Sequence, residues 1–327
     1  MRQFEFFASK QLFFVGTRTE SCCTFVANQQ KQCMLKFLLI TMALFLYSAG
    51  YAQWMKLNSG TNQTINDIHF SSIDTGYAVG QQATILKTVN AGQQWISLSV
   101  PTSADLKSVY FKNNLDGFIV GQNSMLHTQD GGINWSTITI SPTVVLNDIY
   151  FVDAQIGFAA ANAGILLKTT DGGFNWQLIN TPATDDISSI QFPHPDTGYA
   201  VQTGYNWSFL KTVDAGQTWT LDTIQPISGW SNIQTVYFTT AQKGFIGGWY
   251  LSAFAGTNNG GLSWHSLDSS NSINLNSIYF LNEMQGYAVG YDNQIYTSID
   301  GGATWSYDIV NYSYFSVVSG VANQAIY

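Results

Sequence analysis

Six short segments of the chain each place a hydroxyl residue, an acid or amide, a glycine and a tryptophan within eight residues, as in "TTDGGFNW" at 169–176. The acid or amide position holds, in chain order, Asn90, Asp130, Asp171, Asp214, Asn259 and Asp300. An aspartate beside glycines could ligate calcium, act as a general acid, or accept hydrogen bonds inside a turn. Asparagine is a poor calcium ligand and no acid, yet its amide oxygen still accepts hydrogen bonds. We therefore predict six structural hairpin corners, with no catalytic, metal-binding or cofactor-binding role.

The tryptophans of these segments recur at a nearly constant interval of 40 to 45 residues. With one earlier copy, they are Trp54, Trp95, Trp135, Trp176, Trp219, Trp264 and Trp305. Within the first unit, Ile68 and Phe70 are followed six residues later by a glycine, and then by the short runs "GYAVG" (76–80) and "ILKT" (85–88). Such runs, separated by turn residues, predict four antiparallel strands in each unit. A four-stranded unit repeated about every 40 residues is typical of a β-propeller blade.

The two ends of the array complement each other. The segment "QWMKL" (53–57) is similar to a fourth strand without a unit of its own, and "SVVSGVANQAIY" (316–327) aligns with the start of a unit. Joining the two ends would close the ring and limit exposed strand edges. We therefore predict an all-β fold over residues 53–327, a seven-bladed β-propeller of four-stranded antiparallel blades whose last blade is incomplete at the C-terminus. We also expect the natural chain to continue beyond Tyr327.

The N-terminal part has the pattern of an export signal. From Met34 the chain places a lysine, an apolar run over 37–47, and small residues before Gln53, which is the order found in secretory signal peptides. We predict that residues 34–52 are a signal peptide and that residues 1–33 are an upstream extension. The mature protein would then be extracellular, at the cell surface or in the periplasm, without membrane insertion. A retained membrane anchor is the alternative, although the apolar run is short for a span.

Cleavage at Gln53 would restrict the available chemistry. It removes all three cysteines, Cys22, Cys23 and Cys33, together with both arginines. The mature chain could then form no disulfide, thiol nucleophile or cysteine-ligated zinc site. Residues 53–327 hold seven lysines against eighteen acidic residues, a net charge of −11. This charge argues against nucleic acid and anionic lipid as partners, because both are held largely by lysine and arginine.

The corner segments resemble the Asp-box, or BNR, repeat, in which a serine or threonine, an aspartate, a glycine and a tryptophan stand at these spacings. With "GYAVG" and "ILKT" upstream, the units are similar to the propeller family of the photosystem II stability and assembly factor over residues 53–327. The resemblance implies a β-propeller, exported as are similar proteins of Bacteroidetes-type bacteria. That family is associated with an arginine-rich face, which a mature chain without arginine cannot provide. We therefore carry over the architecture and not the partner.

Asp-box propellers also include enzymes. Sialidases grip a substrate carboxylate with three arginines, which the mature chain lacks. A propeller similar to the xyloglucan hydrolases would need two carboxylates across a cleft. Acidic positions outside the corners are Asp67, Asp74, Asp105, Asp116, Asp148, Asp153, Asp185, Asp186, Asp196 and Asp292. Most recur at equivalent positions of different units, and the histidines His69, His127, His194 and His265 have no ligand spacing. We predict that the protein is not an enzyme, and that His69 and His127 are packing residues.

The two longest units carry additional aromatic residues in their connections. These are Trp207, Trp230 and Trp249, together with Tyr205 and Tyr250. They could form a platform for a sugar ring or a protein partner, or they could pack on one another over a hydrophobic seam. We predict an exported, non-enzymatic β-propeller that binds a protein or glycan ligand. The alternatives are a carbohydrate-active, glycoside hydrolase-like enzyme and a structural module of a longer surface or adhesin protein.

Overall fold

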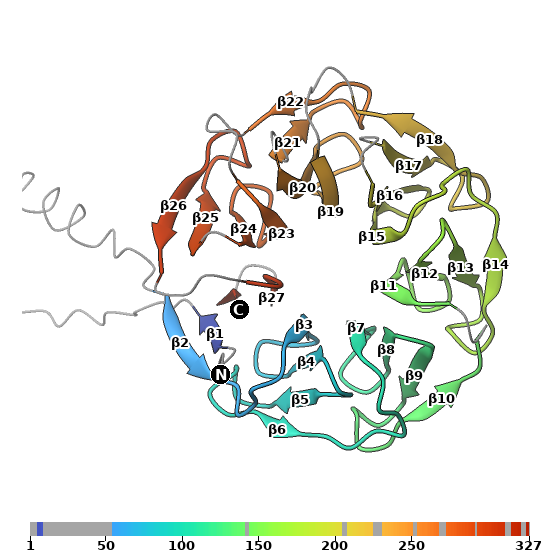
Figure 1. Cartoon of the computed structure of the whole chain (residues 1–327), viewed down its shortest axis with the longest axis vertical. Coiled ribbons are helices and arrows are strands. Elements are labelled where there is room, and N and C mark those ends of the chain that lie inside the picture. The colour runs from blue at the N-terminus through green and yellow to red at the C-terminus, as the bar shows by residue number, and fades with distance from the viewer. Residues whose placement is uncertain are drawn as a thin grey trace, which may run out of the picture.

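The computed structural model describes residues 5–8, 54–140, 144–204, 208–224, 231–250, 254–267, 273–291, 293–310, 315–321 and 325–326. Regular structure in these ranges is entirely β-strand. Among the same residues, no helix is long and apolar enough to cross a membrane. Six four-stranded antiparallel sheets stand around a common centre as the blades of a propeller (Figure 1).

Each blade uses four strands in chain order, from the centre of the ring outward (Figure 1). The first, innermost strands are β3 (Ile65–Phe70), β7 (Leu106–Phe111), β11 (Leu146–Phe151), β15 (Ile187–His194), β19 (Ser231–Phe238) and β23 (Leu275–Phe280). The second strands are β4 (Gly76–Gly80), β8 (Gly117–Gly121), β12 (Gly157–Ala161), β16 (Thr197–Gln202), β20 (Gly244–Tyr250) and β24 (Gly286–Gly290). The third are β5 (Ile85–Thr88), β9 (Ser124–Thr128), β13 (Leu166–Thr169), β17 (Ser208–Thr212), β21 (Phe254–Thr257) and β25 (Gln294–Ser298). The fourth are β6 (Ile96–Ser97), β10 (Ser136–Ile138), β14 (Gln177–Ile179), β18 (Thr220–Thr223), β22 (His265–Ser266) and β26 (Ser306–Ile309).

The prediction of seven blades is wrong, because the structure has six blades of four strands. At the two ends of the chain, the described residues form only two-stranded sheets. β1 (Glu5–Ala8) pairs with β2 (Met55–Asn58), and β27 (Gly320–Val321) pairs with β28 (Ala325–Ile326). The fourth strand expected at residues 53–57 corresponds to β2, and its partner β1 lies in the segment that we predicted to be an upstream extension. The two strand pairs are not joined in one four-stranded sheet.

Residues from the C-terminal segment nevertheless lie between the last blade and the first. The Tyr279 hydroxyl donates to the carbonyl oxygen of Gly320 at 2.8 Å. Val318 is buried in a cluster with Tyr287 of the last blade, whereas Val317 packs against the core of the first blade. The segment thus contacts both blades, and it places apolar side chains against each of them.

The repeated phenylalanine and glycine have a direct structural reason. In the first blade, the ring of Phe70 lies over Gly76, so that a Cβ atom there would come within 2.6 Å of the ring. The same overlap occurs at the glycine of every other blade. Because the glycine has no side chain, the aromatic ring packs on the backbone of the second strand. The six-residue spacing read from the sequence is therefore a packing requirement between the first two strands.

Polar side chains link each blade to the next. On the innermost strands, the hydroxyl of Tyr110 donates to the carbonyl oxygen of Phe151 at 3.0 Å, and Tyr150 makes the equivalent contact with Phe192 at 3.0 Å. Farther out, the ammonium groups of Lys87 and other lysines donate to carbonyl oxygens in the corner of the following blade. These contacts are Lys87 to Gly131 at 2.7 Å, Lys112 to Gly172 at 2.9 Å, Lys168 to Ala215 at 2.8 Å and Lys211 to Gly260 at 2.7 Å. Four of the seven lysines in residues 53–327 therefore join neighbouring blades.

Candidate functional site

The six Asp-box corners share one hydrogen-bond pattern, which the third blade illustrates. The Thr169 hydroxyl donates to Asp171 Oδ1 at 2.8 Å and accepts from the backbone N–H of Gly173 at 2.9 Å. Asp171 Oδ1 also accepts the backbone N–H of Asn175 at 2.9 Å. Beyond this shared pattern, the indole N–H groups of Trp176 and Trp305 donate to the carbonyl oxygens of Gly173 and Gly302, at 3.0 and 3.2 Å. Gly173 has φ of 98°, a conformation that favours glycine. The carboxylate thus organises its own turn.

Asparagine makes the same contacts in the two corners that lack an acid. The backbone N–H of Gln94 donates to Asn90 Oδ1 at 2.9 Å, and that of Ser263 donates to Asn259 Oδ1 at 2.9 Å. At the four acidic corners, hydrogen bonds to the carboxylate lower the pKa to about 2. The main donors are Asn134, Asn175, Thr218 and Thr304, each four residues beyond its aspartate. Those carboxylates are ionised at neutral pH. Among the described residues, no group of three or more His, Cys, Asp or Glu could hold a metal ion.

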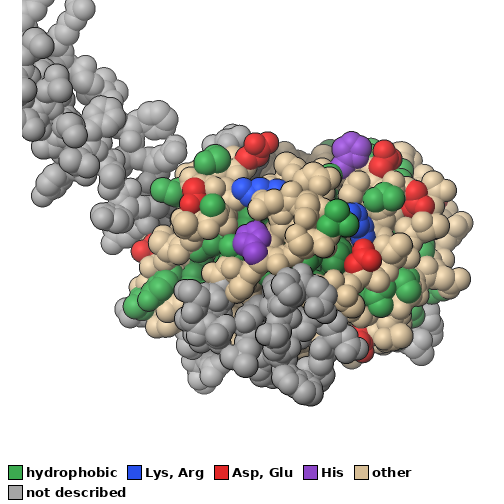
Figure 2. Space-filling view, turned by 90° about the horizontal axis from the view of Figure 1, so that it is seen from above, with side chains coloured by type: hydrophobic (Ala, Val, Ile, Leu, Met, Phe, Trp, Pro, Cys, Tyr) green, Lys and Arg blue, Asp and Glu red, His purple; other side chains and the backbone are tan. Residues whose placement is uncertain are grey.

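The corners and the turns between the first and second strands together form one side of the ring, which we call the corner face. In the first blade, the backbone N–H of Ala91 donates to the carbonyl of Asp74 at 3.0 Å, and in the third blade Gly172 donates to Gln155 at 2.9 Å. The equivalent bond occurs in all six blades. Every corner also exposes one large apolar side chain. These are Val89, Ile133, Phe174, Val213, Leu262 and Ile299, between 61% and 83% exposed. Figure 2 views the ring from its edge and shows exposed hydrophobic and acidic side chains interspersed along the rim.

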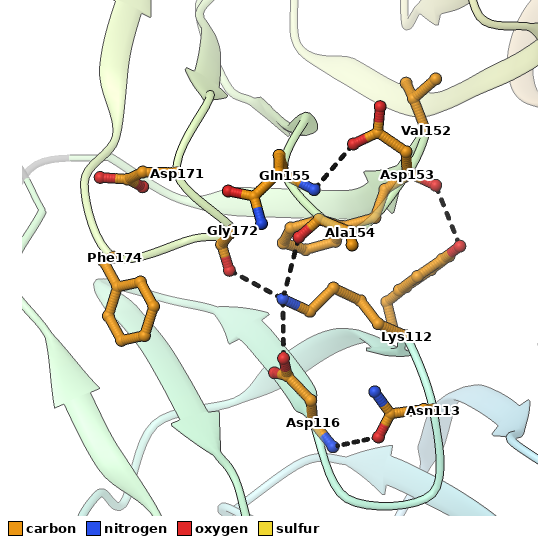
Figure 3. Close-up of a pocket in the computed structure, with 12 residues that line it drawn as sticks. Lys112, Asn113, Asp116, Val152, Asp153, Ala154, Gln155, Asp171, Gly172 and Phe174 are labelled. Carbon is orange, nitrogen blue, oxygen red and sulfur yellow. Dashed lines mark hydrogen bonds and ion pairs between the residues drawn. The ribbon is translucent and has the colours of Figure 1, made fainter.

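A cavity of about 400 Å³ opens on the corner face between the second and third blades. Lys112 crosses it, and its ammonium group contacts Asp116 Oδ2 at 2.8 Å and the Gly172 carbonyl at 2.9 Å (Figure 3). Asp153 and Asp171 lie on either side of this lysine (Figure 3). Three carboxylates therefore line the cavity against the ammonium group of Lys112.

Aromatic groups border the same cavity. Phe174, on the third-blade corner, is 61% exposed, and its ring meets the edge of His127 at 5.7 Å. His127 is buried in the second blade, stacks on Phe118 at 4.2 Å, and contacts Asp116 Oδ1 at 2.9 Å. Phe174 is therefore held across the junction of the two blades while most of its surface stays open. An exposed ring beside carboxylates can hold a cationic group.

Two acids on the innermost strands form a different arrangement, and we call Asp67 and Asp148 the inner acids. The hydroxyl oxygen of Ser108 lies 2.9 Å from Asp67 Oδ2 and 3.0 Å from Asp148 Oδ1. The three residues occupy the same strand position in the first, third and second blades. Backbone N–H groups complete the contacts, with Val109 at 2.8 Å from Asp67 and Ile190 at 2.8 Å from Asp148.

Counting hydrogens shows that the inner acids favour a protonated state. The Ser108 hydroxyl has one hydrogen and can donate to only one of the two carboxylates. If one carboxyl is protonated, it donates to Ser108, which in turn donates to the other. Burial is the main cause that raises the pKa of Asp67 to about 7 and that of Asp148 to about 6, and the negative charge of Asp148 raises the pKa of Asp67 further. Because both carboxyls touch one hydroxyl group, no substrate can lie between them, unlike the acids of a glycoside hydrolase.

The sequence had grouped Asp67 with Asp148 as equivalent positions, but nothing local indicated that a serine joins them. The one available sequence signal was Ser108, which occupies the equivalent strand position in the second blade, between the blades of the two acids. His69 packs against Tyr110 at 5.0 Å. Burial is the main cause that lowers the pKa of His69 to about 4, so its ring is neutral at physiological pH.

The predicted aromatic platform is only partly visible. Trp207, Trp230 and Tyr205 lie outside the described residues, and Tyr250 ends strand β20. The Trp249 indole N–H donates to Asn276 Oδ1 at 2.8 Å, and its ring meets Tyr291 at 5.3 Å. Trp249 therefore packs against the following blade. Asp292 also lies outside the described residues.

Fold and corners define this protein as an Asp-box β-propeller, and comparisons with known proteins refine the class. The family described as photosynthesis system II assembly factor YCF48 matches residues 47–145. The photosystem II stability/assembly factor HCF136 of Oryza sativa subsp. japonica is 33% identical over 81 residues, which are 23% of this chain and 20% of that protein. The photosystem II assembly lipoprotein Ycf48 of Synechococcus sp. (strain CC9902) is 27% identical over 129 residues, 37% of this chain and 38% of that protein. The matches thus span well under half the length of these relatives.

Solved structures agree on the fold. A structure of YCF48 bound to D1 peptide has a TM-score of 0.70 at 23% identity, covering 84% of this chain and 96% of that one. The GH74 enzyme of Niastella koreensis has a TM-score of 0.62 at 14% identity, covering 75% of this chain and 45% of that one. The chain is therefore a β-propeller similar to the photosystem II assembly factors, and its likeness to the hydrolase is more distant.

Proposed function

We propose that this protein is an exported, non-enzymatic β-propeller that binds another protein, as an assembly or interaction module does. Its similarity to the assembly-factor propellers carries the proposal, since one of those structures is described as bound to D1 peptide. The exposed apolar side chains on the corner face support it, because exposed apolar groups gathered on one side mark sites of protein contact. The identity of that partner is not carried over to this protein, since the sequence matches cover only part of the relatives' length.

Site-specific photo-crosslinking tests this function. A photoreactive residue would replace Ile133 on the corner face, Leu178 on the outer rim, or Trp249 near the opposite face, in the organism that carries the gene. We expect a defined crosslinked protein from at least one face and none from the rim. The same weak background at all three positions would contradict a protein-binding role.

Glycan binding or hydrolysis is the second candidate, favoured by the likeness to the GH74 fold. The proposed contact would be the aromatic set predicted from the sequence, Trp207, Trp230, Trp249, Tyr205 and Tyr250. Release of reducing ends from plant or host glycans would support an enzyme. Binding of the wild type to a glycan array, together with loss of this binding in Trp249→Ala, would support a lectin-like module. Neither result is expected from a protein-binding propeller.

Export is part of the proposal and has its own test. Residues 34–52 have the order of a signal peptide. Mass spectrometry of the protein from its native cells should find a mature N-terminus at Gln53 and the protein outside the cytoplasm. A protein that retains residues 34–52 and fractionates with the membrane would instead support a kept anchor.

A further inference from the structure

The cavity between the second and third blades combines features that fit one kind of ligand. We infer that it receives a basic side chain, lysine or arginine, from a protein partner whose neighbouring apolar residues pack on Phe174 and Leu115. This inference rests on the proposed protein-binding function and adds the site and the chemistry of the partner. It concerns the corner face and not the aromatic set predicted from the sequence.

The net negative charge of the cavity lining favours a cationic ligand. The residues that line the cavity include three aspartates, Asp116, Asp153 and Asp171, and one lysine, Lys112, which leaves two negative charges in excess at neutral pH. The ammonium group of Lys112 is already occupied by Asp116 Oδ2 at 2.8 Å and by the Gly172 carbonyl at 2.9 Å. An incoming anion would therefore meet the carboxylates of Asp153 and Asp171 beside an ammonium group that is already bonded. An incoming guanidinium or ammonium group would meet acceptors on both sides.

The carboxylates are oriented before any ligand arrives. Asp153 Oδ1 accepts the backbone N–H groups of Gln155 and Ile156, each at 2.7 Å. Asp171 is fixed in the same way by its corner. These bonds occupy Oδ1 of each acid, and Asp171 Oδ2 also accepts from Asn175 Nδ2 at 2.7 Å. Acceptor capacity for an incoming donor remains on Oδ2 of both acids. Fixed acceptors reduce the entropy that binding would otherwise lose.

The apolar edge of the cavity distinguishes this junction from the others. Phe174 lines the cavity and is 61% exposed, and Leu115, which is 59% exposed, stands on the turn that supplies the lining residues Asn113 and Asp116. The residues at the position of Phe174 in the other corners are Gln93, Ile133, Gln217, Leu262 and Ala303. Of the six corners, this one alone offers an aromatic ring at that position, which can stack on a guanidinium group as well as pack on an aliphatic neighbour. The site therefore fits a segment that alternates basic and apolar residues.

The chain itself supplies conservative variants for the test. Asparagine replaces the corner acid at Asn90 and Asn259 with the same backbone bonds. Asn113 occupies the position of Asp153 in the second blade and accepts the same two N–H groups. The double variant Asp153→Asn/Asp171→Asn should therefore fold and lose only charge. Asp214→Asn/Asp300→Asn removes the same charge from corners of other blades and is the matched control. Leu262→Ser is the control for Phe174→Ser.

Fluorescence anisotropy with the full chain would use three short labelled peptides: alternating Arg–Leu, Glu–Leu and Arg–Ser. We expect the Arg–Leu peptide to bind best, to lose about tenfold in affinity in Asp153→Asn/Asp171→Asn, and to lose roughly fivefold in Phe174→Ser. The control variants should leave its affinity unchanged. Equal losses in the two double variants would show attraction to net charge alone and would overturn the site. Preference for Glu–Leu would overturn the predicted chemistry.

The two proposals can fail separately. Photo-crosslinking could find a partner at Trp249 but not at Ile133, while the Arg–Leu peptide binds the cavity variants as tightly as the wild type. In that case the protein binds a partner elsewhere and the basic-side-chain site is wrong. If no position crosslinks a partner, the protein-binding function itself fails.

Discussion

The corner aspartates and the inner acids are the same side chain in two environments that move the pKa in opposite directions. In the corners, the pKa falls to about 2, as for Asp171. On the innermost strands, it rises to about 7 for Asp67 and about 6 for Asp148. Both groups accept backbone N–H bonds. The difference is therefore not the number of donors but the surroundings, since water solvates the corners whereas protein atoms surround the inner acids.

This contrast gives the two groups different tasks. A corner acid is charged, and an asparagine can replace it because only its acceptor oxygens are used. At the inner acids, both oxygens of each carboxyl accept backbone N–H bonds, and one of the two carboxyls must also donate to Ser108, which only a protonated carboxyl can do. The first group stabilises single turns within a blade. The second joins the first three blades of the ring through Ser108.

The largest expected effect is a loss of stability between about pH 4 and pH 7. Because the pKa values of Asp67 and Asp148 are raised, the folded state holds protons that the unfolded chain has released. The stability from these acids is full below about pH 4 and is lost as the pH rises through about 6 and 7. A tenfold change in proton affinity corresponds to about 1.4 kcal/mol, so the expected loss is on the order of a few kcal/mol. Urea unfolding followed by tryptophan fluorescence measures it.

The corner acids predict the opposite slope at lower pH. Their lowered pKa values give stability that is present above about pH 4 and lost as the pH falls through about 2. Stability should therefore be greatest near pH 4 to 5. The variant Asp130→Asn/Asp171→Asn should flatten only the acid side of the curve. A wild-type stability that is constant or rises from pH 4.5 to 7.5 would refute the account of the inner acids.

The substitution Asp67→Asn should destabilise the protein by about 1–3 kcal/mol at pH 5, the cost of a buried donor without an acceptor. Asp67 Oδ1 accepts the N–H of Ile68 and Oδ2 accepts that of Val109. An amide nitrogen cannot accept at either place. Chemical denaturation at pH 5 measures the change. If the variant is as stable as the wild type, the carboxyl is not held as described.

Removing the shared hydroxyl should have a somewhat smaller effect. Ser108→Ala leaves Asp67 and Asp148 without their common partner, and we expect a loss of about 1–2 kcal/mol. Ser277→Ala is the matched control, because Ser277 occupies the same strand position and its hydroxyl makes a long contact of 3.5 Å with Val318. Equal losses in the two variants would mean that the hydroxyl at this position acts without regard to the acids.

The smallest expected effect is that of Asp171→Asn. Asn90 and Asn259 already make the corner contacts, and exposed substitutions of this kind usually change stability very little. Thermal unfolding at pH 7 checks it. A loss comparable with that of Asp67→Asn would show that the corner needs charge, and it would remove the distinction between the two groups of acids.

Particular residues show how far the sequence predicted the fold. The spacing of Phe70 and Gly76 and the recurrence of Trp95 marked the strands and corners of all six complete units. The prediction of a seventh blade failed because we joined residues 53–57 and 316–327 into one blade, whereas in the structure β2 pairs with β1 and β27 pairs with β28 in separate sheets. Strand pairing depends on which edge is available in space, and a local pattern does not reveal it.

The candidate site was harder to predict than the fold. Asp171 was recognised as a corner residue, but its place beside Asp153 and Phe174 depends on how the third blade packs on the second. Nothing in the sequence singled out Lys112, which contacts a carbonyl sixty residues away in sequence. Such contacts form between repeats, where no sequence period records which side chains meet.

By itself the sequence determined the repeating unit, its strands and its turns, because hydrophobic spacing, glycine geometry and corner hydrogen bonds act over a few residues. Only the tertiary structure decided the number of complete blades, the proton held between Asp67 and Asp148, and the cavity beside Phe174. Each of these depends on groups about forty or more residues apart, whose distances and hydration exist only once the blades have packed.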